Sequence, residues 1–316
     1  MKNLIRLVQH WLLDRESLEN SEKLTKKNAV EGLIPKSPCN NSKHCTDQES
    51  NVSEAVLGNL QMKLRSFGIT DVGLKRNHNE DDFFRSDDLA VYLVADGMGG
   101  HAAGEVASHA SVQTISEFCE RYAKDSSLTW PFGYDTRLSD EGNALITGIQ
   151  LANQTVCKMQ QQRPELSGMG TTIAALRMTS EQALVAHVGD SRVYRFRHNQ
   201  LELLTSDHSW VNEQLQKNII TPEEARTHRY KNVITRALGN RNELEIDVRL
   251  ETIEPGDIFL LCSDGLSGMI PDEEMARILA HTKDDIRNCA NTMVAKANEA
   301  GGHDNISVVI VACLAE

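Results

Sequence analysis

The sequence predicts an α+β fold in which two antiparallel β-sheets pack face to face as a sandwich, flanked by pairs of helices. Short apolar runs typical of strands lie at both ends of the region from residue 61 to residue 316, and helical patterns lie between and after them. Strands and helices therefore do not alternate, as they do in parallel βαβ folds. About 250 residues of this kind fit a single domain.

The N-terminal segment has a different character. Within residues 1–13 the apolar side chains fall mostly on one helical face, which predicts an amphipathic helix that docks on the protein's own body or tethers it to a partner or a membrane surface. From residue 14 to about residue 60 the chain is polar and has no sustained apolar period. This composition is typical of a disordered linker. We therefore expect an N-terminal extension over residues 1–60 and one folded domain over residues 61–316.

The first half of the domain contains three predicted strands followed by two long helices. The strands are short runs of apolar and β-branched residues bounded by turn residues, at 67–73, 83–84 and 90–95. Helices with an apolar stripe follow at 104–119 and 139–162. These helices form the first of the two predicted helix pairs.

In the second half the pattern is mostly that of strands. The predicted strands cover residues 171–176, 183–188, 191–196, 201–204, 246–250, 258–262 and 306–313. Asn199-Gln200 predicts a hairpin turn between the third and fourth of these. A helix start is predicted at Thr221-Pro222, where a capping residue precedes proline and two acids. The second helix pair covers 272–281 and 284–299.

Composition excludes several classes of protein. The net charge of −12 argues against non-specific binding of DNA or RNA, which needs a basic surface. No apolar stretch approaches the ~20 residues that span a bilayer, and the N-terminus lacks the apolar core and cleavage site of a secretory signal. The seven cysteines show no CxxC pair or zinc spacing. We therefore expect a reduced, cytoplasmic protein that acts as a monomer.

Acidic residues recur where predicted strands begin or end. Asp96 and Asp264 each stand between a strand and a glycine, Asp190 follows a third strand, and Asp304 precedes the last one. Glu80-Asp81 lies beside another strand start. A single Asp-Gly turn is common, and isolated turn acids are the alternative interpretation. The recurrence favours acids that converge, and without a His or Cys cluster beside them they indicate an all-oxygen site for Mg²⁺ or Mn²⁺.

These acids belong to a set of short motifs that stand in a characteristic order. The motifs are Arg76-Asn77-His78-Asn79-Glu80-Asp81, Asp96-Gly97-Met98-Gly99-Gly100, Gly168-Met169-Gly170-Thr171-Thr172, Val188-Gly189-Asp190-Ser191-Arg192, Asp207-His208-Ser209, Ser263-Asp264-Gly265-Leu266 and Gly302-His303-Asp304-Asn305. With them the chain resembles the metal-dependent protein phosphatase (PPM) family of the phosphatase 2C type, in its bacterial form. The resemblance covers roughly residues 64–314, and the motifs taken together are highly specific for this family. It implies a four-layer αββα sandwich.

The resemblance implies a centre of two Mg²⁺ or Mn²⁺ ions at one edge of the sandwich. Asp96 would bridge both ions, and one of them would also be held near Glu80 and the Gly97 carbonyl. Asp264 and Asp304 would hold the other. The four carboxylates sum to −4, which two divalent ions return to 0, so a phosphate dianion is no longer repelled.

Further residues match the rest of the family's site. Arg76 matches the phosphate-binding arginine, whose planar fork suits two phosphate oxygens at once. Asp190, with Asp264, matches the place where bacterial members hold a third, weaker ion. Asp81 matches an acid that supports the site without binding metal. The residues expected to carry catalysis are thus Arg76, Asp96 and Asp264.

The implied activity is hydrolysis of phosphoserine and phosphothreonine in proteins by direct attack of a metal-activated water. The implied partners are a phosphorylated protein and a cognate Ser/Thr kinase, with no nucleic acid. Cys262 does not lie in a phosphate-cradling loop, which weighs against a cysteine-dependent phosphatase. A catalytically inactive binding scaffold is the alternative, and a metal-dependent nuclease or phosphodiesterase is disfavoured by the negative charge.

Two features of the resemblance leave questions open. Met98 stands where many eukaryotic relatives carry His as a general acid, so the proton donor is unassigned. His101 is one candidate, against a solvated surface role, and a water on the metal is the default expectation. Residues 205–239 match the mobile flap beside the bacterial active site. Arg226, His228 and Arg229 in it are candidates for substrate selection, against the alternative of a solvated loop.

Overall fold

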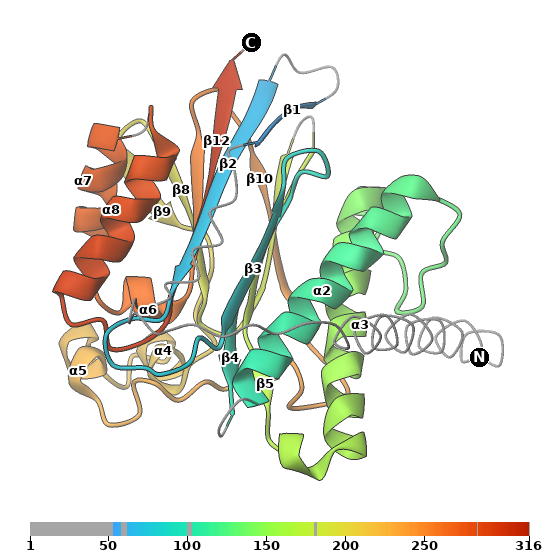
Figure 1. Cartoon of the computed structure of the whole chain (residues 1–316), viewed down its shortest axis with the longest axis horizontal. Coiled ribbons are helices and arrows are strands. Elements are labelled where there is room, and N and C mark those ends of the chain that lie inside the picture. The colour runs from blue at the N-terminus through green and yellow to red at the C-terminus, as the bar shows by residue number, and fades with distance from the viewer. Residues whose placement is uncertain (1–52, 58–61, 100–102, 180–181, 283, 316) are drawn as a thin grey trace, which may run out of the picture. The chain divides into compact units, whose positions relative to one another are not determined.

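Two antiparallel β-sheets form the centre of the domain (Figure 1). This computed structural model describes residues 53–57, 62–99, 103–179, 182–282 and 284–315. The prediction of an amphipathic helix at 1–13, and most of the predicted linker, lie outside these residues. Among the described residues, no helix combines the length and the apolar character that crossing a bilayer requires.

The first sheet has the strand order β1-β2-β12-β11-β8-β9. Its strands are β1 (Ser53–Leu57), β2 (Met62–Asp71), β8 (Arg192–Arg197), β9 (Gln200–Leu203), β11 (Ile258–Cys262) and β12 (Ile306–Ala315). All of β11 is buried, because it lies between two other strands and between two apolar layers. The sheet begins with β1, inside the range expected to be linker, so ordered structure starts before residue 61.

The second sheet has the order β10-β7-β6-β4-β3, with β5 paired to β4. Its strands are β3 (Asp81–Ser86), β4 (Val91–Met98), β5 (Gly170–Thr171), β6 (Ile173–Met178), β7 (Gln182–Val188) and β10 (Asp247–Thr252). The strand predicted at 90–95 begins one residue later, because Ala90 adopts a left-handed φ of 52° in the preceding turn. The strand also continues through Asp96 to Met98, so the backbone of Asp96 is part of the strand.

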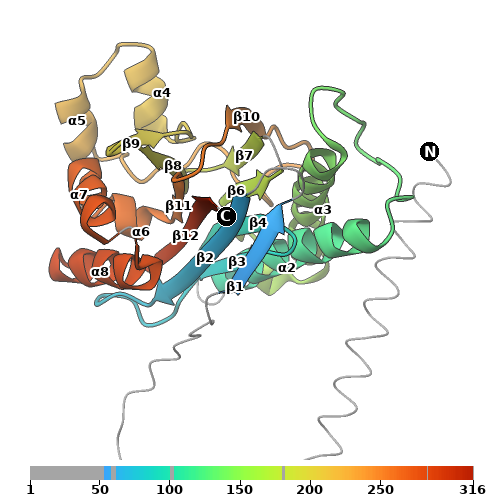
Figure 2. The same cartoon turned by 90° about the horizontal axis from the view of Figure 1, so that it is seen from above.

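Helices cover the outer face of each sheet (Figure 2). α2 (Ala103–Lys124) and α3 (Asp140–Gln162) pack on the second sheet, and α6 (Asp264–Ser267), α7 (Asp272–Thr282) and α8 (Ile286–Glu299) pack on the first. Within β11, Leu261 faces the other sheet while Leu260 faces the helices. Because each central strand is apolar on both faces, its sequence reads as an unbroken apolar run. The predicted αββα sandwich is confirmed.

The connections follow local turn and cap chemistry. The predicted hairpin turn lies one residue earlier than expected: His198 and Asn199, with φ values of 51° and 61°, form it, because Gln200 in β9 already pairs with Arg197. Thr221 begins α5 (Pro222–Thr227) with a capping box that includes Glu224. A further helix that the sequence pattern did not predict, α4 (Trp210–Gln216), begins at the cap Ser209. A short 3₁₀ helix, η1 (Pro164–Leu166), follows α3.

Candidate metal centre

The backbone of Asp96 is held by hydrogen bonds with Thr171 and Thr172. Asp96 lies on β4 directly opposite Asp81 on β3. Its backbone N–H donates to the Thr172 hydroxyl at 3.0 Å, and its carbonyl accepts from the Thr172 N–H and the Thr171 hydroxyl, both at 2.9 Å. The backbone that carries this carboxylate is therefore fixed by the packed sheet behind it.

The predicted acids converge at this end of the sandwich. Asp96 interacts electrostatically with Asp81, Asp264, Asp190 and Asp304, although these residues come from separate segments of the chain. Burial, together with the repulsion among these acids, raises the pKa of the Asp96 carboxyl well above its ordinary range. The structure thus brings together acids from recurring motifs that are far apart in the sequence and that were expected to converge.

Two neighbouring acids show the same effect. Burial raises the pKa of Asp81 to about 7, against hydrogen bonds from Ser263 and Ser307 that oppose the shift. Burial, and then the charge of Asp264, raises the pKa of Asp190 to about 7. Burial and mutual repulsion disfavour the ionised forms of these carboxylates unless a cation is bound beside them.

Three carboxylate oxygens of this group lack a partner. Within the described part of the chain, the buried Oδ1 atoms of Asp81, Asp190 and Asp264 accept no hydrogen bond. Buried polar atoms nearly always have a hydrogen-bond partner, so a cluster of unpartnered carboxylate oxygens indicates a binding site for a ligand. Carboxylate oxygens are the ligands that Mg²⁺ and Mn²⁺ prefer. The residues present therefore fit a centre of hard divalent ions.

Glu80 reaches the site because two glycines leave room for it. The Gly97 N–H donates to the Glu80 carbonyl at 3.0 Å. A Cβ atom on Gly104 would lie 2.7 Å from the Glu80 Oε2 atom, and one on Gly97 would clash with the Gly104 carbonyl. Burial, opposed by Arg76 and aided by Asp304, raises the pKa of Glu80.

Arg76 lies at the exposed rim of the group. Its Nη2 atom donates to the Oδ2 atom of Asp304 at 2.6 Å, and about half of its side chain (47%) remains exposed. The preceding loop is fixed because the backbone N–H groups of Leu74 and Lys75 both donate to the Gly302 carbonyl. One cation thus stands at the open side of a cluster of acids.

Comparison with known proteins decides the family. The model of the family described as "Protein phosphatase 2C" matches residues 74–297. This chain belongs to the protein phosphatase 2C family. It is 39% identical over 245 residues to the "Serine/threonine phosphatase stp" of Listeria welshimeri, covering 77% of this chain and 93% of that protein. It is 36% identical over 247 residues to "Protein phosphatase PhpP" of Streptococcus pneumoniae, covering 77% and 95%.

Solved structures agree with that assignment. The Mycobacterium tuberculosis serine/threonine phosphatase PstP/Ppp matches with a TM-score of 0.70 and 32% identity, over 80% of this chain and 99% of that one. Stp1 from Staphylococcus aureus matches with a TM-score of 0.69 and 30% identity, over 81% and 96%. A further PstP structure is described as a complex with two manganese ions. The predicted family, fold and enzyme class, a protein phosphatase, are confirmed.

The phosphatase site also depends on a residue that the sequence analysis quoted but gave no role. The Asn305 amide donates to the carbonyls of Val72 and His78, both at 2.9 Å, and its oxygen accepts the Glu80 N–H at 2.8 Å. Asn305 therefore joins the loop that bears Asp304 to the loops that bear Arg76 and Glu80. Its place directly after Asp304 was the only signal in the sequence.

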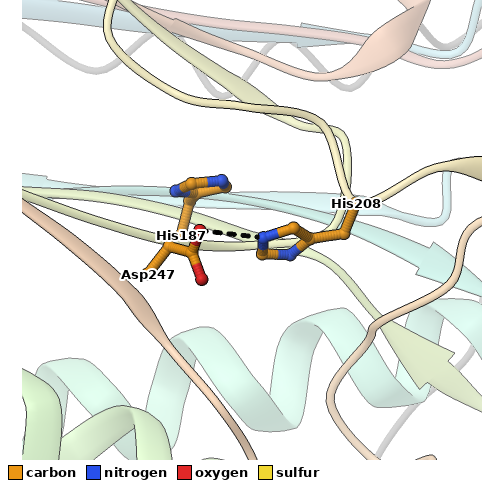
Figure 3. A group of neighbouring side chains, drawn as sticks. All are labelled: His187, His208 and Asp247. Atoms are coloured by element: carbon orange, nitrogen blue, oxygen red, sulfur yellow. Dashed lines mark ion pairs between the residues drawn. The ribbon is translucent and has the colours of Figure 1, made fainter. Parts of the chain in front are cut away.

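A second polar cluster lies at the base of the flap (Figure 3). His187, His208 and Asp247 place potential ligand atoms within 4.8 Å of one another. The two rings are stacked, with centroids 4.7 Å apart and planes 19° apart, so their in-plane lone pairs do not converge on one ion. Arg236 donates to Asp247 at 2.6 Å and supplies the positive charge. The cluster is better explained as a link between the flap and the sheet than as a metal site.

The flap contains helices rather than only irregular chain. α4 and α5 occupy much of residues 205–239, and Arg226 and Arg229 are exposed on it. His228, however, stacks on Trp210 with ring centroids 4.6 Å apart, so its side chain packs within the flap. Met98 ends β4, and His101 lies outside the described residues.

Proposed function

We propose that this chain, a protein-serine/threonine phosphatase, hydrolyses phosphoserine and phosphothreonine in proteins with a pair of Mn²⁺ or Mg²⁺ ions. Asp96 would bridge the ions, with Glu80 and the Gly97 carbonyl on one side and Asp264 and Asp304 on the other. The convergence of acids on Asp96, with the buried Oδ1 atom of Asp264 unpartnered among them, carries this proposal. When bound, such ions lower the pKa of a water molecule to give a nucleophile and offset the charge of the phosphate.

Arg76 would bind the phosphate. One nitrogen of its guanidinium donates to Asp304, and about half of the side chain is exposed to a ligand. A planar fork can donate to two phosphate oxygens together, which orients the phosphoryl group as well as attracting it. Arg76 and the bound cations would thus overcome the repulsion between an acidic protein and a dianionic substrate.

Three further assignments extend this function. Asp190, with Asp264, would hold a third and weaker ion, because its buried Oδ1 atom also lacks a donor. The flap would select the protein substrate through exposed Arg226 and Arg229. The substrate would be a phosphoprotein made by a Ser/Thr kinase, and a cytoplasmic location is consistent with five described cysteines that are all free thiols.

The test is turnover of a phosphothreonine peptide by Asp96→Asn and Asp264→Asn, measured as phosphate released in Mn²⁺. Both variants should lose at least about 10³-fold in kcat, since each removes a ligand charge. Asp135→Asn, which changes an acid in an ion pair with Arg137 at the surface, is the matched control and should retain activity. Retained turnover in either ligand variant would remove the two-metal assignment, and no turnover by the wild type would favour the inactive scaffold.

A further inference from the structure

Two buried hydroxyl groups meet behind the metal centre. The Oγ1 atom of Thr172 and the Oγ atom of Ser191 are 2.7 Å apart, and both residues are almost fully buried, with 0% and 1% of their surface exposed. Thr172 lies between β5 and β6, and Ser191 lies between β7 and β8. The hydrogen bond therefore joins a connection within the second sheet to the connection that runs from the second sheet to the first.

Thr172 is hydrogen-bonded to the backbone of one acid, and Ser191 is the neighbour of another in the sequence. Thr172 accepts the Asp96 N–H with its side chain at 3.0 Å and donates its own N–H to the Asp96 carbonyl at 2.9 Å. Ser191 directly follows Asp190 in the chain. The hydroxyl pair thus connects the backbone of the proposed bridging acid to that of the acid proposed for the third ion.

Packing at Gly189 strengthens the same connection. A Cβ atom at Gly189 would lie 2.6 Å from both Cβ and Cγ2 of Thr172, so the turn before Asp190 rests directly on the Thr172 side chain. Gly189 also has a φ of 106°, which favours glycine. The turn that carries Asp190 is therefore positioned by Thr172 through both a van der Waals contact and a hydrogen bond.

The two hydroxyl groups make different hydrogen bonds. The Thr172 oxygen accepts from Asp96, and one hydroxyl of the Thr172–Ser191 pair donates to the other. Without the Ser191 hydroxyl, Asp96 keeps its partner, but the hydrogen bond between Thr172 and the Asp190 turn is lost and only the packing of Gly189 on Thr172 remains. Without the Thr172 hydroxyl, both the Asp96 N–H and the Ser191 hydroxyl lose a partner. The two residues therefore make different and separable contributions.

We propose that Thr172 and Ser191 are positioning residues that hold the Asp190 carboxylate at a fixed distance from Asp96 and thereby set the affinity of the third ion. The inference rests on the proposed function, and neither residue is a metal ligand in it. Groups that orient ligands from behind are worth about 10–100-fold in metal affinity. Ser191 would influence only the weakest ion, whereas Thr172 would influence that ion and those on Asp96.

The experiment titrates Mn²⁺ into the full chain by isothermal titration calorimetry. Ser191→Ala should weaken the weakest binding step about 10–100-fold and leave the tighter steps at wild-type affinity. Thr172→Val should weaken the tighter steps as well, and Thr172→Ser, which keeps the hydroxyl group, should restore them. Adding Ser191→Ala to Thr172→Val should cost the weakest step little more, because both substitutions remove one shared bond.

Thr155→Val is the matched control. Its hydroxyl group is also buried, but it donates to the Leu151 carbonyl within α3 at 2.9 Å, so Mn²⁺ binding should be unchanged. Wild-type binding in Ser191→Ala and Thr172→Val would overturn the inference, as would an equal loss at every step in Ser191→Ala. A wild-type chain that binds no Mn²⁺ overturns the proposed function as well. Thus a normal wild type with unaffected variants removes only the role of the hydroxyl pair.

Discussion

Asp81 and Asp96 are direct partners across the antiparallel pair β3–β4, so two acids occupy neighbouring positions at one end of the sheet. Like charges directly opposite each other destabilise a sheet. The charges of Asp264 and Asp304 add to the repulsion on both residues. The fold therefore gives up stability at this place in the absence of metal, which is a common property of functional sites.

Metal should restore that stability. Mn²⁺ at about 100 times its Kd should stabilise the folded chain by about 2.7 kcal/mol, and EDTA should reverse the shift. Scanning calorimetry with and without Mn²⁺ measures it. Asp264→Asn should show a much smaller shift, because one ligand charge is gone. A melting temperature that Mn²⁺ does not change would contradict the presence of a metal centre.

Arg76→Ala should lower kcat/KM for a phosphothreonine peptide by about 10²–10³-fold, since a charge-assisted, bidentate contact to phosphate is lost. Arg76→Lys should recover part of this loss, because Lys keeps the charge and lacks the fork. Steady-state kinetics in Mn²⁺ provide the measurement. Arg137→Ala, which removes an exposed arginine paired with Asp135, is the control. Unchanged kinetics in Arg76→Ala would exclude a phosphate-binding role.

Much of this site could be predicted because its signals are local. Buried strands are apolar on both faces, so β4 and β11 were visible in the sequence, and an acid followed by glycine lies within the last three residues of β4 and two residues after β11. α4 was not visible, because none of its residues is buried and it has no apolar stripe. The role of Asn305 was also hidden, since its partners lie more than 200 residues away in the chain.

The cluster of His187, His208 and Asp247 at the base of the flap could not be predicted from the sequence either, for a similar reason. His187 lies on β7, Asp247 on β10 and His208 at the start of the flap. Strand pairing places His187 opposite Asp247, and hydrogen bonds with the backbone of Gly189 hold His208 beside them. Sequence patterns report the periodicity within one element and not the pairing of distant elements. The motif around His208 was recognised, but its stacking partner was not.

This histidine pair makes the domain sensitive to acid. Burial lowers the pKa of His208, and so do the charges of His187 and Arg236, although Asp247 opposes them. Burial also lowers the pKa of His187, against the Ser206 carbonyl and the charges of Asp247 and Asp207, while Arg236 lowers it further. The unfolded chain, with ordinary histidines near about 6.5, then binds more protons than the folded one. The stability is present above that pH and is lost as the pH falls below it.

The buried acids of the metal centre have raised pKa values and contribute the opposite pH dependence in every variant, so the histidine effect is measured as a difference between variants. From pH 7.5 to pH 5.5 we expect the free energy of unfolding in urea to change in the destabilising direction less in His187→Gln than in the wild type. His281→Gln, which alters an exposed histidine on α7, should follow the wild-type pH dependence. An equal pH dependence in all three proteins would show that the stacked pair does not take part.

A ring of alternating charges links the edges of the two sheets. Arg195 on β8 pairs with Glu202 on β9 and Glu251 on β10, and Arg249 on β10 pairs with the same two acids. Arg195 and Glu251 are the buried members, with 12% and 13% of their side chains exposed. β9 is an edge strand of the first sheet and β10 is an edge strand of the second, so the ring of charges connects these two edges.

Glu251→Gln should lower the free energy of unfolding by about 3 kcal/mol, because it leaves Arg195 largely buried with one acid in place of two. Equilibrium unfolding in urea measures this loss. Glu299→Gln, in the exposed pair of Glu299 with Lys296 at 2.7 Å, should cost at most about 0.5 kcal/mol. In a cycle with Arg195→Met, the double variant should lose less than the sum of the single variants, since the second change removes the charge that the first left unpaired. Strict additivity would mean that the ring carries no coupling between the two sheets.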